Sequence, residues 1–107
     1  MRVLKFIVNG QKLQKDPECD FSGLVAGSSK WLQAEFIFSS EWDARQKAAS
    51  FYSQFQEYPV MLDEHNICLI PDEAVASGPF YVSVTGKEGD SMIPTNMYAV
   101  HQERRKC

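Results

Sequence analysis

The sequence predicts an all-β fold, namely a single antiparallel β-sandwich of the immunoglobulin-like or jelly-roll-like kind, with one or two short helical turns. Apolar and polar residues alternate over short stretches, as they do on strands with one buried and one wet face. Turn signals recur at intervals of roughly 8–12 residues, which indicates about seven or eight strands. The 107 residues, 44% of them hydrophobic, suffice for one domain over residues 1–107 without disulfide or metal support.

The N-terminal segment is predicted to begin with a hairpin. A strand is expected over 2–8, because alternate apolar residues share one face and the turn-forming pair Asn9-Gly10 follows. Residues 12–14 return as the second arm. The segment 19–30 is rich in glycine and serine and is predicted to be a loop, with a short strand around Leu24-Val25.

The clearest strand of the chain spans 31–38, where every second residue is apolar. A turn or single helical turn over 41–45 follows, with a serine as its cap. Residues 47–55 are predicted to be a strand, because aromatic residues alternate there with small polar ones. A helix over 41–55 is the alternative, since the alanines and aromatic residues of this segment also match a helical stripe.

A second hairpin is predicted between a short strand over 60–62 and a return strand over 67–70. The proline-containing segment 57–59 is expected to break the chain before it, and the polar connection 63–66 has a length typical of hairpins. Pro71 opens a short helical turn, because the missing N–H of proline does no harm at the first helical position.

The C-terminal part is predicted to hold two strands. Phe80, Val82 and Val84 share one face of a strand over 80–86. The last strand spans 93–102 and is bent at a proline. Residues 103–107 are expected to form a flexible tail.

Residues that could catalyse a reaction or bind a metal do not occur at the spacings of known catalytic or metal-binding motifs. His65 and His101 lack further ligands at motif spacing, and no Cys-x-x-Cys pair occurs. Nucleophile-elbow and phosphate-loop motifs are also missing. The chain is therefore predicted to have no catalytic, cofactor-binding or metal site and not to be an enzyme. A small enzyme remains an alternative, and it would use the carboxylates of predicted turns: Asp63, Glu64, Asp72 and Glu73.

The net charge, the apolar runs and the cysteines of the chain restrict the classes of partner and the cellular compartment that we expect. The net charge is −3, and the basic cluster 104–106 is interpreted as a solvated tail, so no nucleic acid is expected. No apolar run reaches the roughly 20 residues of a membrane span, and the N-terminus does not resemble a signal peptide. Synthesis in a cytoplasm is therefore expected. Cys19, Cys68 and Cys107 are predicted to be reduced thiols, with Cys68 buried.

Four tyrosines lie outside the alternating apolar positions that are expected to form the core, and they are the candidates for a surface role. They are Tyr52, Tyr58, Tyr81 and Tyr98. Exposed aromatic groups mark protein interfaces more often than ligand shelves, so we interpret them as interface candidates. The alternative is a carbohydrate-binding β-sandwich module in which exposed aromatic residues stack on sugars.

Several motifs in a fixed order resemble those of small β-sandwich modules in tail and baseplate proteins of bacteriophages and prophages, such as the N-terminal domain of the siphophage upper baseplate protein. The similarity covers about residues 31 to 102, and the stretch 11–30 has no counterpart. The motifs, in chain order, are Ala34–Ser39, Glu41-Trp42, Lys47-Ala48, Cys68–Val75, Phe80–Gly86, and Ile93–Asn96 with Val100.

This resemblance implies a non-enzymatic structural or adaptor module that acts by protein–protein association. The implied partners are further copies of the chain or other tail and baseplate proteins, with surface polysaccharide as a further possibility, and the implied location after assembly is the virion tail. Within these motifs, Trp42 is interpreted as a packing anchor at the end of the sandwich. Pro71 is expected to carry the chain between sheets, and Asn96 to satisfy backbone groups near a bend. The structural and interface candidates are Trp31, Trp42, Tyr52, Tyr58, Pro71, Tyr81, Asn96 and Tyr98.

Overall fold

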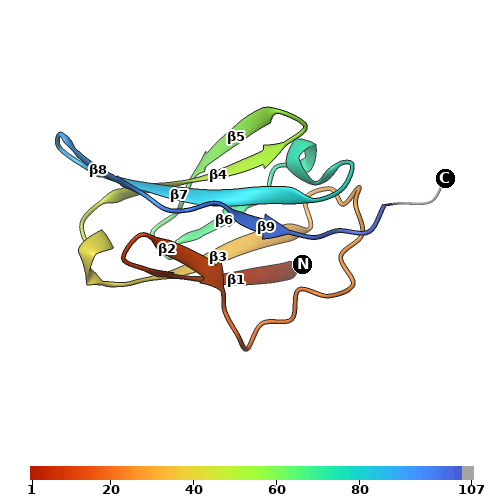
Figure 1. The fold of residues 1–107 in the computed structure, drawn as a ribbon, viewed down its shortest axis with the longest axis horizontal. Helices are drawn as coiled ribbons and strands as arrows, with labels where there is room; N and C mark the ends of the chain where they lie inside the picture. Colours follow the sequence, from red (N-terminus) through yellow and green to blue (C-terminus); the bar gives the residue numbers. More distant parts are fainter. Residues whose placement is uncertain (105–107) are drawn as a thin grey trace.

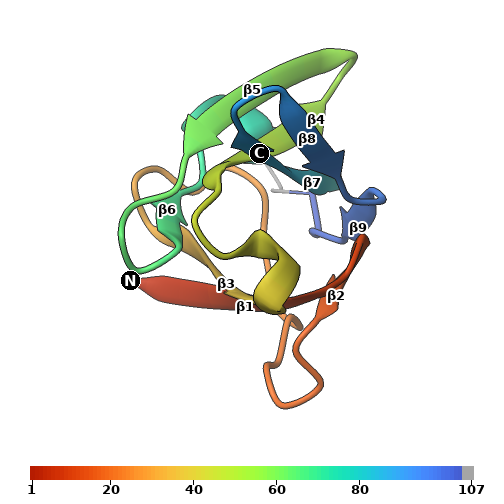
Figure 2. The ribbon, with the colours of Figure 1, turned by 90° about the vertical axis from the view of Figure 1, so that its left-hand side faces the viewer.

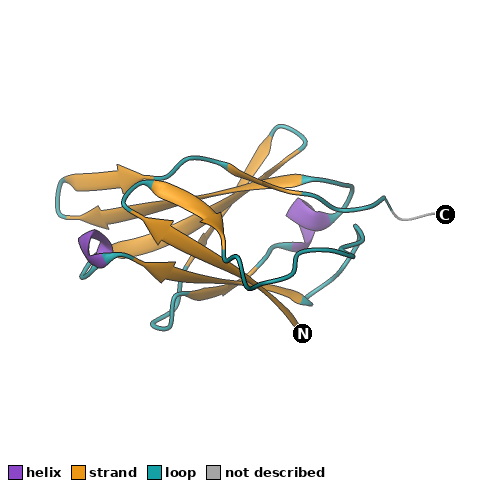
Figure 3. Ribbon diagram, turned by 60° about the horizontal axis from the view of Figure 1, so that its bottom comes forward, coloured by secondary structure: helices purple, strands orange, loops and turns teal. Residues whose placement is uncertain are grey.

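The computed structural model describes residues 1–104, which form two facing β-sheets with two short 3-10 helices (Figures 1 and 3). One sheet has four strands in the order β2-β1-β3-β6, and the other has five, in the order β5-β4-β7-β8 with β9 pairing with β7. The prediction of an all-β chain with short helical turns is confirmed. The elements are β1 (Arg2–Asn9), β2 (Lys12–Lys15), β3 (Leu32–Phe38), η1 (Ser40–Trp42), β4 (Gln46–Ser53), β5 (Gln56–Met61), β6 (Ile67–Leu69), η2 (Asp72–Val75), β7 (Phe80–Glu88), β8 (Ser91–Pro94) and β9 (Tyr98–Val100).

The core lies between the two sheets, as the alternation in the sequence predicts. The ring of Phe6 from β1 stacks on Phe36 from β3, with 5.1 Å between centroids. From the facing sheet, Phe51 and Phe80 lie 6.4 Å apart, and all four rings are buried. Burial of a large aromatic side chain contributes on the order of 2–3 kcal/mol, so these rings are a major part of what holds the sheets together.

The prediction that all strands are antiparallel is wrong for one pair. Strands β1 and β3 run parallel, in register from Arg2↔Leu32 to Val8↔Phe38, whereas the other pairs of named strands are antiparallel. The long loop between β2 and β3 returns the chain past β1, so that β3 starts at the same end as β1 (Figure 1). Its backbone is tied to β1 by Asp16 N, which donates to Lys5 O at 3.0 Å.

The predicted hairpin around residues 63–66 is also wrong. Strand β5 belongs to the five-stranded sheet and β6 to the four-stranded sheet, so the 63–66 segment crosses between sheets. Strand β5 includes Pro59, which was expected to break the chain. Proline is tolerated there because β5 is the edge strand of its sheet. The role expected of Pro71 is confirmed, since η2 leads the chain from β6 to β7 and thus back to the other sheet.

The segment between β8 and β9 joins the two sheets along one side (Figure 2). The predicted single strand over 93–102 is interrupted here, because Thr95 Oγ1 accepts the hydrogen bond of Val84 N at 2.9 Å. The side chain of Asn96 behaves as an extra peptide group toward β2. Its Oδ1 accepts from Leu13 N at 2.7 Å, and its Nδ2 donates to Leu13 O at 3.2 Å. Asn96 therefore satisfies backbone groups near a bend, as expected.

The end of the described chain is tied to the 19–30 loop. Ala26 N donates to Glu103 O, and Glu103 N donates to Leu24 O, both at 2.8 Å. The short strand expected at Leu24-Val25 is thus a single parallel bridge between Val25 and Glu103. Glu103, the first residue of the predicted tail, is held in place, and residues 105–107 of that tail lie outside the described residues.

Candidate functional site

Trp42 is completely buried, as its interpretation as a packing anchor requires. Its indole Nε1 donates to Gly10 O at 2.7 Å, and its ring lies 5.1 Å from the ring of Phe38. Gly86 of β7 lies so close that a Cβ there would come within 2.7 Å of the indole. Trp31 precedes β3 and is 44% exposed, whereas Trp42 follows β3 and is buried. The two tryptophans therefore do not lie together on an exposed face.

The four candidate tyrosines divide into two groups. Tyr98 packs edge-on against Phe6, with 6.0 Å between centroids, and Tyr58 is half-buried against the core. These two contribute to the core. Tyr52 of β4 and Tyr81 of β7 are direct cross-strand neighbours on the outer face of the five-stranded sheet, and Tyr81 is 46% exposed. The structure thus brings two of the candidates together.

Phe55, which was not among the candidates, is the most exposed large apolar residue of the described chain. It lies with Gln54 in the two-residue turn between β4 and β5, and both residues have positive φ, +51° for Gln54 and +67° for Phe55. Such turns normally carry Asn-Gly, because other L-residues are strained at positive φ. A strand over 47–55, as predicted, would place Phe55 on the same face as the buried Phe51, so the predicted strand extends too far. A Gln-Phe pair gives no turn signal, so local pattern could not have placed it at the tip.

A hollow of ≈280 Å³ lies beside this turn. Its lining residues, all uncharged, are Tyr52, Ser53, Gln54, Phe55, Pro79 and Tyr81. We call Tyr52, Phe55, Pro79 and Tyr81 the aromatic end. It combines a projecting phenyl ring with an adjoining apolar recess, a shape suited to contact with another molecule.

The outer face of the five-stranded sheet continues from the aromatic end along β4 and β7. Its central side chains are small and paired across the strands: Ser50 with Ser83, and Ala48 with Thr85. Ser50 donates to Glu57 Oε2 at 2.6 Å, and the hydroxyl groups of Tyr52 and Ser83 lie 3.3 Å apart. Neighbouring side chains therefore already cover Ser50 and Ser83, which are buried, and the hydroxyl groups of both have partners.

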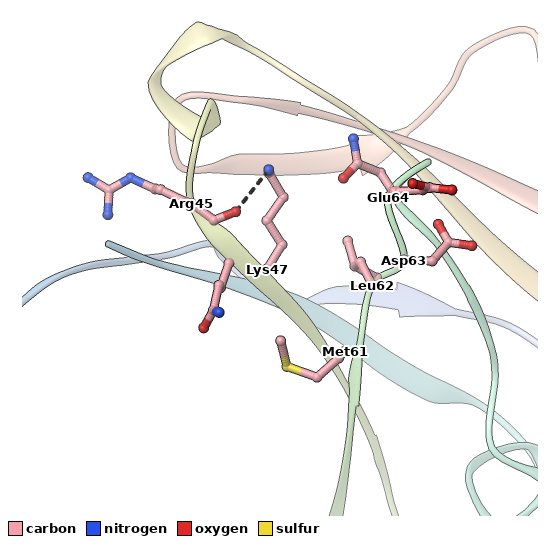
Figure 4. A pocket seen from close by; sticks show the side chains of 8 residues that line it. Arg45, Lys47, Met61, Leu62, Asp63 and Glu64 are labelled. Carbon is pink, nitrogen blue, oxygen red and sulfur yellow. Dashed lines mark hydrogen bonds between the residues drawn. The ribbon is translucent and has the colours of Figure 1, made fainter. Parts of the chain in front are cut away.

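A polar cleft of ≈340 Å³ lies at the opposite end of β4, between Lys47 and the segment Met61–Asn66 (Figure 4). Lys47 Nζ donates to Arg45 O at 3.1 Å and lies 5.4 Å from the centroid of Phe38. The guanidinium of Arg45 points away from Lys47 and is bound to Ser91 O and Oγ at 3.2 and 3.0 Å. Both cations are thus held mainly by contacts within the chain.

The turn carboxylates serve as loop anchors. Asp63 Oδ1 accepts from Ile67 N at 3.0 Å and from His65 N at 2.8 Å, and the bond from Ile67 is the main cause of the lowered pKa of Asp63. Asp72 accepts from Lys30 N and from the hydroxyl of Ser29, at 2.9 and 2.8 Å, which lowers its pKa as well. A glycosidase acid needs a raised pKa, so the shift in both aspartates is in the opposite direction.

Possible metal ligands and the buried thiol lie within the described part of the chain. Within residues 1–104, no three His, Cys, Asp or Glu side chains are grouped so that they could hold a metal ion. Cys68 is buried, as predicted, and burial raises the pKa of its thiol to about 12. No helix among these residues is long and apolar enough to cross a membrane.

Comparisons of the chain with protein-family models, with curated proteins and with solved structures found no match.

Proposed function

We propose that this protein is a non-enzymatic structural or adaptor module that acts by protein–protein association in a phage or prophage tail or baseplate-like assembly. The observation that carries the association is Phe55, a fully exposed phenyl ring on a residue with φ of +67°. We also propose that the two facing sheets form an immunoglobulin-like or jelly-roll-like sandwich, with the aromatic end as its contact surface.

The position of Phe55 works against the stability of the isolated chain. An L-residue in the left-handed region raises the free energy of the folded chain by about 1–2 kcal/mol. A phenyl ring that stays in water gives no stabilisation by burial to offset this cost. Strained residues of this kind cluster at functional sites, where another interaction makes use of them. Burial of the ring in a partner would supply that interaction.

The composition of the aromatic end also supports a protein partner. Interface cores are enriched in aromatic residues and methionine and depleted in charge. Tyr52, Phe55 and Tyr81 supply the aromatic groups, and the hollow beside them is lined by uncharged residues. Met61 and Met92, both exposed, lie on the edge strands of the same sheet.

The assignment to a phage-type assembly rests on the ordered motif resemblance over residues 31–102. Under this proposal the protein is made in the cytoplasm and becomes part of a tail or baseplate, next to other copies of itself or to other tail proteins. No chemical step is required of it, which agrees with the anchoring role of Asp63 and Asp72 in their loops.

Co-expression with the tail proteins encoded beside its gene tests this function. We expect the wild-type chain to elute with at least one of them as a complex of defined mass, measured by light scattering. Phe55→Asn should weaken that complex at least about 10-fold, because the variant keeps the turn but loses the ring. Ile37→Ser, which removes an exposed apolar residue from the other sheet, is the matched control and should leave the complex unchanged.

A carbohydrate-binding module is the second candidate function. The cross-strand pair of half-buried Tyr52 and exposed Tyr81 favours it, and exposed Trp31, next to β3 of the other sheet, is a separate aromatic candidate. Aromatic faces stack on sugar rings. Titration with a panel of surface polysaccharides, followed by tryptophan and tyrosine fluorescence, tests it. A saturable change that Tyr81→Ala or Trp31→Ala removes supports sugar binding, and a flat response across the panel excludes it.

A further inference from the structure

We propose that a second copy of this chain binds the outer face of the five-stranded sheet, so that two such faces pack together about a two-fold axis parallel to the strands. This inference rests on the proposed function, because it takes the aromatic end as a contact surface. It goes further by naming the partner and the geometry of the contact.

The register of β4 and β7 makes the face self-complementary. Three cross-strand pairs on the outer face matter here: Tyr52 with Tyr81, Ser50 with Ser83, and Ala48 with Thr85. A two-fold axis that runs midway between these antiparallel strands places β4 of one copy over β7 of the other and leaves each pair at the same position along the strands. Each pair of one copy therefore faces the same pair of the other copy. Two-fold interfaces require this kind of self-matching surface.

The same axis relates the projecting ring to the hollow. Phe55 follows the end of β4, and Pro79 precedes the start of β7, so the two residues lie on opposite sides of the axis at the same end of the sheet. Rotation therefore carries the Phe55 ring of one copy onto Pro79 and Tyr81 of the other. Each copy donates one ring and receives one, and the hollow of ≈280 Å³ is the recess that receives it.

The centre of the face permits close approach. Sheets that pack face to face lie about 10 Å apart, which requires small or interdigitating side chains. Ser50, Ser83 and Ala48 are small, and Ser50 and Ser83 are already buried beneath neighbouring side chains. The Ser50 hydroxyl is bound to Glu57 at 2.6 Å, and that of Ser83 lies 3.3 Å from the Tyr52 hydroxyl. Covering this face therefore leaves few polar groups unsatisfied.

Charge does not oppose the contact, although two copies of a chain with net charge −3 repel each other overall. The charged residues of the three strands that form most of the face are Lys47, Glu57, Lys87 and Glu88. Lys47 faces inward, toward the ring of Phe38. Pairing across the strands places Glu57 and Lys87, one of each sign, on the outer side. The face itself is thus close to neutral.

The size of the face sets the expected strength of the dimer. Four strands about 4.8 Å apart and about seven residues long cover roughly 400 Å², less than the about 800 Å² that each partner contributes to a standard interface. A weak dimer is expected, with a Kd of about 10–500 µM. Such affinity suits a component that is held at high local concentration within a larger assembly.

Sedimentation equilibrium of the full chain, from about 10 µM to about 1 mM, tests the proposal. The wild type should fit a reversible monomer–dimer equilibrium. Phe55→Asn should weaken the dimer at least about 10-fold while the variant stays folded, because asparagine tolerates positive φ. Ile37→Ser, on the outer face of the other sheet, should have no effect.

A charge-complementation experiment tests the orientation of the two copies. Ala48 of one copy faces Thr85 of the other, so Ala48→Lys and Thr85→Glu should each dimerise more weakly than wild type. An equimolar mixture of the two variants should associate more tightly than either alone, because one new ion pair forms across the axis. Without this rescue the proposed axis is wrong.

A wild-type chain that remains monomeric up to about 1 mM, or a dimer that tolerates Phe55→Asn, overturns the second-copy proposal. If that monomer still forms a Phe55-dependent complex with a neighbouring tail protein, the proposed function stands and only the choice of partner is wrong. If the dimer forms as described but no tail protein binds, the second-copy contact stands and the proposed function fails.

Discussion

Gly86→Ala should destabilise the fold strongly, because Gly86 faces the buried Trp42. The added Cβ would lie 2.7 Å from both Cε3 and Cζ3 of the indole. Ordinary contact begins near 3.4 Å, so the ring would have to shift by about 0.7 Å. The shift is resisted by the bond from Nε1 to Gly10 O at 2.7 Å and by the Phe38 ring at 5.1 Å. We expect a loss of about 2–3 kcal/mol in the free energy of unfolding, as for other overpacked cores.

Thermal and urea unfolding measure this loss, which corresponds to a decrease in Tm of roughly 8–15 °C for a domain of this size. Gly78→Ala is the matched control, since a Cβ at Gly78 would meet no atom of the described chain within 4 Å. It should change stability by less than about 1 kcal/mol. Equal effects of the two substitutions would refute the packing role of Trp42, because backbone entropy alone would then explain them.

Phe55→Asn should raise the free energy of unfolding by about 1 kcal/mol and Tm by about 4 °C, since asparagine is less strained at φ +67°; a decrease in Tm would show that Phe55 supports the isolated fold. Asn96→Ala should cost about 2–3 kcal/mol in urea unfolding, because Leu13 loses both bonds to the side chain and its N–H is left unsatisfied; a loss below about 0.5 kcal/mol would argue against its role in joining the sheets. Hydrogen bonds lower the folded-state pKa of Asp63 below its ordinary value of 3.8, so its contribution is present above about pH 4 and is lost as the pH falls further. Asp63→Asn should flatten that acid limb of the stability profile, and an unchanged limb would contradict the anchoring role.

Local alternation was sufficient to predict the strands that face the core on one side. Phe36 in β3 and Val82 in β7 occupy buried positions within regular period-2 patterns. The choice of a strand over a helix is correct for most of the segment 47–55, because β4 places Ala49 and Phe51 in the core and Ser50 and Tyr52 on the outer face. These features depend on near neighbours, which the sequence displays directly.

Long-range pairing was not accessible from the same patterns. Nothing in the local sequence distinguishes a parallel β3 from an antiparallel one, because both present the same face to the core. Strands β5 and β6 looked like a hairpin, since a four-residue polar connection serves a turn and a sheet-to-sheet crossing equally well. The alternation also continued one residue too far at Phe55, where the chain turns without a glycine.

The central claim is that the aromatic end is a contact surface for assembly, and the masses of complexes formed by the wild type and by Phe55→Asn test it most directly. Measured by sedimentation, alone and with the product of each neighbouring gene, the wild type should form a dimer or a mixed complex. The Phe55→Asn variant, at least as stable as the wild type, should lose that association about 10-fold or more. A wild type that stays monomeric in every mixture, or a variant that assembles equally well, would contradict the claim.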